Sequence, residues 1–161
     1  MRVVLRPMTE ETFRTYMRKH EEEYARDRMV TDRESFEQAL RTTRAQHEAM
    51  LPQGLQTPGH YFFRVQDEES NKQVGYVWYA CRPESRQLSL YHILIEHAER
   101  RKGYGRAVLL LIEEKAKELG CQVVWLNVMG HNQGAIDFYV ACRYRVAAIH
   151  MNKFLGAAKD L

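Results

Sequence analysis

Hydrophobic residues recur along the chain with two periods, and these predict an alternation of helices and strands. Apolar residues three and four positions apart predict helices over residues 9–27, 32–50 and 104–119, and a short one after Asn132. Short apolar runs bounded by polar turns predict strands over residues 2–8, 60–65, 74–80, 88–95, 123–128, 145–148 and 150–154. The polar stretch 67–72 predicts a hairpin turn, and the strand–helix–strand order of 88–128 predicts a parallel crossover.

The segment Arg100-Arg101-Lys102-Gly103-Tyr104-Gly105-Arg106 breaks two rules of helix formation at the start of the third predicted helix. The first turn of a helix leaves backbone N–H groups without partners, and Ser, Thr, Asp or Asn usually caps them. This segment contains none of these residues, and its cations lie at the positive end of the helix dipole. An external anion held by the free N–H groups relieves both conflicts, so we predict a phosphate site here.

The segment departs from two common phosphate-binding motifs. The chain has no Gly-Lys-Ser/Thr sequence, which excludes a Walker loop. Val108 stands where a dinucleotide-binding fingerprint has its third glycine, and the strand 123–128 ends without an acidic residue for a ribose. A glycine-rich turn with solvated cations is the alternative interpretation.

A second motif follows in the run Leu126-Asn127-Val128-Met129-Gly130-His131-Asn132-Gln133-Gly134-Ala135-Ile136-Asp137-Phe138-Tyr139. Together with Arg100-x-x-Gly103-x-Gly105, it resembles the GNAT superfamily of N-acetyltransferases. The family's motifs are Q/R-x-x-G-x-G/A and, later in the chain, L-x-V-x-x-x-N-x-x-A-x-x-x-Y. Both occur here in the family's order and spacing, and the agreement is tightest over residues 73–145. The stretch 51–60 also resembles an uncharacterised bacterial subgroup of this superfamily.

The resemblance implies an α/β (α+β) fold in one GNAT domain over residues 1–161. The expected order is β-α-α-β-β-β-α-β-α-β-β, with a mixed central sheet of about seven strands flanked by about four helices. The implied activity is acetyl-CoA-dependent transfer of an acetyl group to a primary amine of a small molecule or peptide, by direct attack in a ternary complex. Two alternatives stay open: another acyl or aminoacyl transferase of this fold, and a CoA-binding sensor without turnover.

The resemblance also implies which residues bind the co-substrate, acetyl-CoA. Its pyrophosphate maps to the loop residues Arg100, Arg101, Lys102, Gly103, Tyr104, Gly105 and Arg106. Its pantetheine arm maps to the strand edge at Ile93, Leu94 and Ile95, and to Asn132, Ala135 and Tyr139. Asn132 is also placed to cap the helix that follows it.

Tyr139 and His92 are the catalytic candidates. A phenol with a pKa near 10 stays protonated at neutral pH and can donate a proton to the leaving thiolate. Packing on an amphipathic helix is the alternative for Tyr139. Simple alternation along the strand 88–95 turns His92 away from the face of Ile93 and Ile95, unless a bulge shifts it. Another side chain or an ordered water is the alternative to His92 as the general base. We expect Glu96 and Glu99 to be solvated loop charges.

One position departs from the family pattern. The family usually continues Tyr-x-x-x-Gly-Phe after the catalytic tyrosine, and here Arg143 stands at the glycine. If the backbone there is left-handed, arginine costs about 1 kcal/mol relative to glycine.

Composition narrows the class of protein. The 161 residues are 45% hydrophobic and 28% charged with a net charge of only +3, and the cations are local, which argues against nucleic-acid binding. No apolar run reaches membrane-spanning length, and residues 1–6 do not form a signal peptide. Three cysteines without a C-x-x-C motif and scattered histidines predict reduced thiols, a cytoplasmic location and no metal site.

The acceptor is the least specified part of the prediction. Acidic residues recur along the first predicted helix, at Glu10, Glu11, Glu21, Glu22, Glu23 and Asp27. Their field favours a cationic amine, although a solvated helix face is the alternative. For the oligomeric state, we allow for a homodimer.

Overall fold

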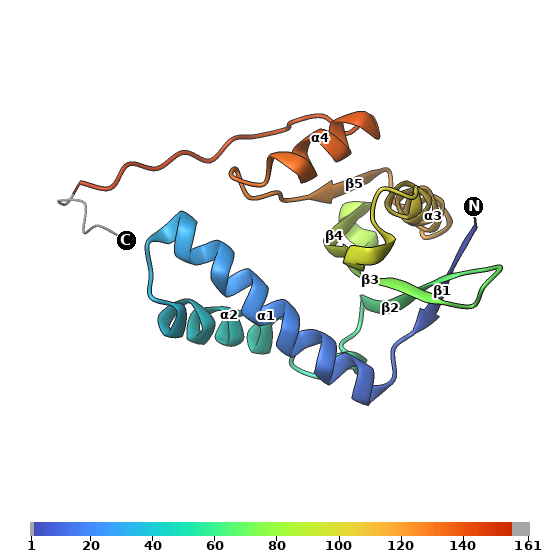
Figure 1. Ribbon diagram of the computed structural model, residues 1–161, viewed down its shortest axis with the longest axis horizontal. Coiled ribbons are helices and arrows are strands. Elements are labelled where there is room, and N and C mark those ends of the chain that lie inside the picture. The colour runs from blue at the N-terminus through green and yellow to red at the C-terminus, as the bar shows by residue number, and fades with distance from the viewer. Residues whose placement is uncertain (1, 156–161) are drawn as a thin grey trace. The chain divides into compact units, whose positions relative to one another are not determined.

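The computed structural model describes residues 2–155, whose elements are drawn in Figure 1. Backbone contacts divide the chain into two compact units, Met1–Met129 and Gly130–Leu161. The first unit contains β1 (Val3–Pro7), α1 (Glu10–Asp32), α2 (Phe36–Met50), β2 (His60–Asp67), β3 (Gln73–Arg82), β4 (Gln87–Ile95), α3 (Tyr104–Glu118) and β5 (Val123–Leu126). The second unit contains α4 (Gln133–Ala141). That residues 1–161 form a single domain stays a prediction.

The five strands form one sheet in the order β1-β2-β3-β4-β5. Neighbouring strands are antiparallel except β4 and β5, which are parallel, so the predicted crossover pairs as expected. The hairpin between β2 and β3 is also confirmed. Its turn is held by Ser70, whose N–H and hydroxyl both donate to Asp67 Oδ1 at 2.8 Å.

The boundary between the first two helices differs from the prediction. The α1 helix continues to Asp32, and the left-handed Arg33 (φ 53°) ends it. The α2 helix begins only at Phe36, because the Ser35 side chain caps it by accepting the N–H of Gln38 at 3.2 Å. The predicted start of the second helix at residue 32 is therefore wrong, because the left-handed Arg33 and the Ser35 cap separate the two helices.

Each face of the sheet is covered by helix, as Figure 1 shows for α1, α2 and α3. On one face, Phe13, Tyr16 and Met17 of α1 pack in one cluster with Phe62 of β2 and Trp78 of β3. On the other face, α3 buries its apolar side, which consists of Val108, Leu109, Ile112 and Ala116. Both faces of the sheet carry side chains from β3 and β4, because successive residues of a strand point to opposite faces.

The predicted closing strands, 145–148 and 150–154, are wrong for the residues that the structure describes: these are irregular, and the sheet has five strands rather than seven. The element order therefore stops after α4 within residues 2–155. Only Ile149 separates the two predicted strands, whereas the tightest common hairpin needs a loop of two residues that favour a turn. Apolar side chains here are also exposed: Val146, Ile149 and Met151 are 64%, 77% and 91% exposed.

Candidate active site

The start of α3 has the uncapped geometry that the sequence predicts. Gly103 precedes the helix with φ 93°, and Arg101 is also left-handed, with φ 62°. No side chain caps the first turn, and that turn contains no acidic residue. The first N–H groups of the helix, at the positive end of its dipole, are thus open to an anion.

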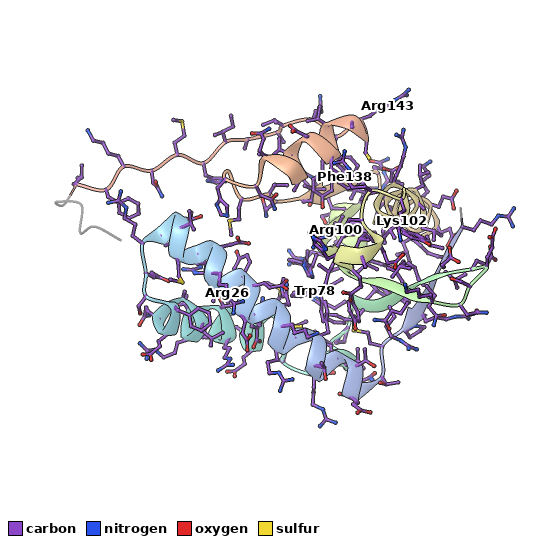
Figure 2. The ribbon with its side chains drawn as sticks, in the orientation of Figure 1. Arg26, Trp78, Arg100, Lys102, Phe138 and Arg143 are labelled. Atoms are coloured by element: carbon purple, nitrogen blue, oxygen red, sulfur yellow. The ribbon has the colours of Figure 1, made fainter. Side chains whose placement is uncertain are left out.

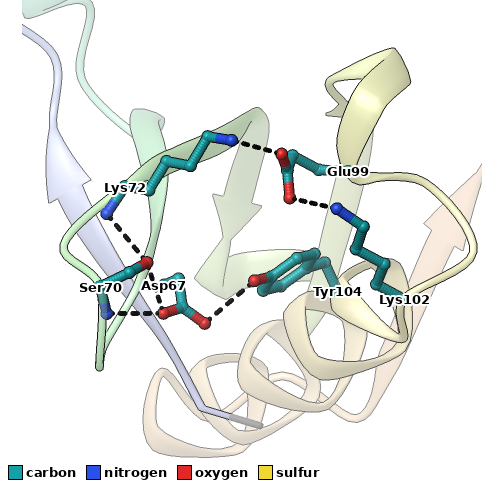
Figure 3. Close-up of polar contacts among 6 residues, drawn as sticks. All are labelled: Asp67, Ser70, Lys72, Glu99, Lys102 and Tyr104. Atoms are coloured by element: carbon teal, nitrogen blue, oxygen red, sulfur yellow. Dashed lines mark hydrogen bonds and ion pairs between the residues drawn. The ribbon is translucent and has the colours of Figure 1, made fainter.

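The loop before α3 is tied to the turn between β2 and β3 (Figure 3). Glu99 accepts from Lys72 at 2.6 Å and from Lys102 at 3.0 Å. The Tyr104 hydroxyl donates to Asp67 Oδ2 at 3.1 Å and connects the same two segments. These contacts hold the approach to α3 in a fixed position, and they direct the Lys102 side chain toward Glu99.

The prediction that Glu99 is a solvated loop charge is wrong. Only 6% of the residue is exposed, and the hydrogen bond from Lys72, followed by that from Lys102, lowers the pKa of its carboxyl. Glu99 therefore stays ionised beside two lysines. The exposed side chains of Arg101 and Arg106 are the loop cations that remain open to an anion.

The far half of β4 has one open edge. The parallel ladder to β5 ends at the pair Leu90–Leu126, while β4 continues to Ile95. The Glu96 N–H bonds to the Val74 carbonyl of β3 at 2.9 Å. Because backbone groups alternate sides along an antiparallel strand, those of Ile93 and Ile95 face the open edge and those of Leu94 face β3.

Arg100 joins this edge to the loop. Its Nε donates to the Ile95 carbonyl at 3.0 Å, and its side chain lines a cavity next to α1. Figure 2 labels Arg100 together with Trp78 from the same unit. The open edge and the uncapped helix start thus lie at the two ends of one short segment, residues 93–106.

A bulge in β4 decides which way His92 points. Trp78 pairs with His92 and Tyr79 pairs with Leu90, so Tyr91 is an extra residue in β4. Beyond the bulge, His92 shares the face of Trp78, toward α1, while Ile93 shares the opposite face with Val77. The bulge therefore brings His92 to the cavity, away from the side chains of Ile93 and Ile95.

This cavity has a volume of about 220 Å³ and lies between α1 and the β3–β4 part of the sheet. Its walls carry five rings, two carboxylates and two cations; they consist of Thr15, Tyr16, Lys19, His20, Glu23, Tyr76, His92, Leu94, Glu96, His97 and Arg100. The rings are close to one another: the centroids of His20 and His92 are 4.3 Å apart, and those of Tyr16 and Tyr76 are 5.4 Å apart. The space suits a small organic group with one charged end.

Two histidines of the cavity, His20 and His92, are uncharged at neutral pH. Burial lowers the pKa of His92 to about 4. Burial, with His92 and His47 nearby, lowers the pKa of His20 to about 2. The neutral His92 ring therefore has one unprotonated nitrogen at pH 7.

The second unit carries the other predicted site residues. Asn132 caps α4, since its Oδ1 accepts the N–H of Ala135 at 3.1 Å, which confirms the predicted cap. Tyr139 lies in the last turns of α4, and burial, followed by the nearby Cys142, raises the pKa of its phenol to about 12. Arg143 is left-handed, with φ 68°, as the family's glycine at this position suggests.

The α1 side of the cavity is not among the residues predicted from the sequence. Phe13, Tyr16, Met17 and His20 follow the i, i+3, i+4, i+7 spacing of one helix face, which could have placed Tyr16 and His20 against the sheet. Nothing in the sequence indicates that Tyr16 meets His92, which lies 76 residues further along the chain.

Over residues 2–155, no group of three or more His, Cys, Asp or Glu side chains is arranged to hold a metal ion. Within the same range, none of the helices combines the length and the apolar character needed to cross a bilayer.

Comparison with known proteins identifies the class. The sequence profile of the acetyltransferase (GNAT) family matches residues 10–143, and the chain belongs to this family. Its members use acetyl-CoA. The mixed α/β fold with four helices and the resemblance predicted from the two motifs are thereby confirmed.

Two relatives from Bacillus subtilis (strain 168) match nearly the whole chain. YdgE, an uncharacterised N-acetyltransferase, is 26% identical over 96% of this chain and 99% of its own length. YycN, also an uncharacterised N-acetyltransferase, is 28% identical over 96% of this chain and 100% of its own length. The crystal structure of YycN matches with a TM-score of 0.88 at 27% identity, over 95% of this chain and 98% of that chain. These matches agree with the bacterial subgroup predicted from the sequence.

Proposed function

We propose that this protein is an acetyl-CoA-dependent N-acetyltransferase that acts on a primary amine by direct attack in a ternary complex. The observation that carries the proposal is the arrangement of residues 93–106. An open strand edge leads directly to an uncapped, cationic helix start, and Leu94, Glu96 and Arg100 of the same segment line a cavity that contains an uncharged histidine. A linear thioester with a phosphate at its far end suits the edge and the helix start together.

In this proposal, acetyl-CoA binds along residues 93–106. The pyrophosphate accepts the N–H groups of residues 101–106, with Arg101 and Arg106 as counter-charges. The pantetheine amides pair with the backbone of Ile93 and Ile95, whose groups face the open edge. The Ile95 carbonyl already accepts from Arg100, so its N–H is the group left for the cofactor.

The acceptor amine enters the cavity beside His92. Its nitrogen lone pair attacks the thioester carbon, the new C–N bond forms, and the C–S bond breaks as the thiolate leaves. His92 accepts the proton that the amine loses. The ring is unprotonated at neutral pH, because burial lowers its pKa to about 4.

The leaving thiolate needs a proton, and we assign this part to Tyr139 on the strength of the family motif. A pKa raised to about 12 keeps its phenol protonated across the physiological range, as a proton donor must be. Asn132 and Ala135, from the same motif, are the proposed contacts to the pantetheine arm.

We also propose a cationic acceptor and a cytoplasmic location. Glu23 and Glu96 line the cavity, and they supply carboxylates that can pair with an ammonium group. The three cysteines Cys81, Cys121 and Cys142 are free, as expected of a reducing compartment. A homodimer stays part of this proposal.

The decisive assay is the release of free thiol from acetyl-CoA by the purified protein, with a panel of amines. Steady release that depends on an amine supports the proposal. Release only from other acyl donors supports a different acyltransferase, and tight CoA binding without release supports a sensor.

A variant tests the co-substrate site within the same assay. Gly103→Val places a branched side chain at the predicted pyrophosphate site, so acetyl-CoA affinity should fall at least 10-fold by calorimetry. Gly120→Val is the matched control, because Gly120 is also left-handed (φ 76°) and has nothing within 4 Å of an added Cβ. Equal affinities of the two variants would place the phosphates elsewhere.

A further inference from the structure

Tyr16 makes the one hydrogen bond that the structure gives to the His92 ring within residues 2–155. Its hydroxyl lies 2.8 Å from His92 Nδ1. Only 3% of Tyr16 is exposed, and its ring packs in the cluster that includes Phe62 and Trp78. The hydroxyl is therefore held in place by the core, and it fixes one edge of the His92 ring.

The direction of this hydrogen bond decides whether His92 can act as a base. If the Tyr16 hydroxyl donates to Nδ1, the neutral ring carries its proton on Nε2 and has no lone pair left for an amine. If Nδ1–H donates to the Tyr16 oxygen, Nε2 keeps its lone pair. A base that acts through Nε2 requires the second arrangement.

The surroundings of Tyr16 favour this second arrangement. Glu23 lines the same cavity and lies two turns after Tyr16 on α1. Burial, and then the charge of Glu23, raise the pKa of Tyr16 well above its ordinary value. A carboxylate in the same cavity attracts the hydroxyl hydrogen, which leaves the oxygen lone pair for Nδ1–H.

We propose that Tyr16 is a positioning residue that selects the Nδ1–H tautomer of His92, so that Nε2 offers its lone pair to the acceptor amine. Glu23 supports this choice by orienting the Tyr16 hydroxyl. The inference rests on the proposed function for its catalytic meaning, while the tautomer itself is a property of the free protein.

Nitrogen NMR of the free protein tests the tautomer without any acetyl transfer. The wild type should show an unprotonated Nε2 on His92 at pH 7. Tyr16→Phe should lose this single tautomer and show averaged shifts for the two nitrogens. Tyr76→Phe is the matched control, because Tyr76 lines the same cavity and has no hydrogen bond to His92, and it should keep the wild-type pattern.

Either of two NMR results overturns the proposal: a wild-type ring protonated on Nε2, or a wild-type pattern that survives in Tyr16→Phe. Glu23→Gln should shift the balance toward the Nε2–H form, and the neighbouring Glu22→Gln should not. An unchanged tautomer in Glu23→Gln removes Glu23 from the proposal.

Steady-state kinetics test whether Tyr16 supports catalysis by positioning His92. Tyr16→Phe should lower kcat about 10- to 100-fold, with the amine KM within about twofold, because only the position of the base is lost. In a His92→Gln background the same change should have less than about a twofold effect. Equal effects in both backgrounds overturn the positioning role. A wild-type protein that releases no thiol instead contradicts the proposed function, and the NMR result still decides the tautomer.

Discussion

A side chain at Gly75 of β3 would collide with the backbone of β4, and the replacement of Gly75 by alanine gives a sharp test of how the site is built. Gly75 pairs with Ile95, at the end of the open edge. A Cβ added at Gly75 would lie 2.0 Å from the Leu94 carbonyl oxygen, about 1 Å inside the 3.0 Å below which real Cβ contacts hardly occur. Because the obstacle is backbone, β4 must move rather than a flexible side chain.

The cost follows from what that movement disturbs. Overpacking costs about 1–3 kcal/mol, and weakening the hydrogen bond from the Glu96 N–H to Val74 adds about 1 kcal/mol. Gly75→Ala should thus lower the free energy of unfolding by about 2–4 kcal/mol. For a chain of this length that corresponds to a fall in Tm of about 5–15 °C. Acetyl-CoA affinity should fall as well, since Ile95 and the Arg100 contact shift with β4.

Thermal unfolding followed by circular dichroism measures the effect. Gly134→Ala is the control, because nothing lies within 4 Å of an added Cβ at this position of α4. It should leave Tm unchanged or raise stability by about 0.5–1 kcal/mol, as expected for glycine to alanine in a helix. A Tm for Gly75→Ala within about 1 °C of the wild type would refute the inferred close approach of the two strands.

Three further predictions concern single residues, and a fourth concerns the charge of the acceptor amine. Tyr139→Phe should lower kcat about 10²- to 10⁴-fold with little change in acetyl-CoA affinity, and a normal kcat would return Tyr139 to a packing role. Burial lowers the pKa of His92 to about 4, so the free energy of unfolding should fall by about 2–3 kcal/mol as the pH falls from 7 to 4, because the unfolded chain takes up the proton first. In urea unfolding, His92→Gln should lack this part of the pH-dependent loss. Arg143→Gly should stabilise the protein by about 0.5–1 kcal/mol in urea unfolding, since φ is 68°, and no gain would mean that the turn tolerates arginine without strain. The kcat/KM for cationic amines should fall steeply between about 50 and 500 mM salt, and a salt-independent rate would contradict a cationic acceptor.

The elements of the first unit were predictable because their signals are local. Periodicity gave the strands and α3, and the polar residues of 67–72 gave the hairpin. The α1 boundary was missed because a left-handed Arg33 carries no sequence signal comparable to a glycine. The last two strands were predicted from apolar composition alone, and composition does not supply the partner strand that a ladder requires.

In the candidate site, too, the features with a local sequence signal could be predicted, and those that depend on distant residues could not. The uncapped start of α3 could be predicted because a missing cap is visible in seven consecutive letters. The burial of Glu99 could not, since it depends on Lys72 reaching across from the turn between β2 and β3. The partnership of Tyr16 and His92 depends in turn on how α1 crosses the sheet, which periodicity does not specify.

The bulge at Tyr91 lets one strand contribute to both proposed ligand sites. Without the extra residue, alternation would keep His92 and Trp78 on opposite faces, and the cavity beside α1 would lose the proposed base. With it, the side chains of His92 and Leu94 line the cavity, while the backbone of Ile93 and Ile95 stays at the edge that β5 leaves open. The proposed cofactor thus meets backbone and the proposed acceptor meets side chains. In this proposal, backbone recognition of the co-substrate leaves a compact loop motif in the sequence, whereas the acceptor site is distributed over α1, β3 and β4. The motifs therefore point to the co-substrate and not to the amine.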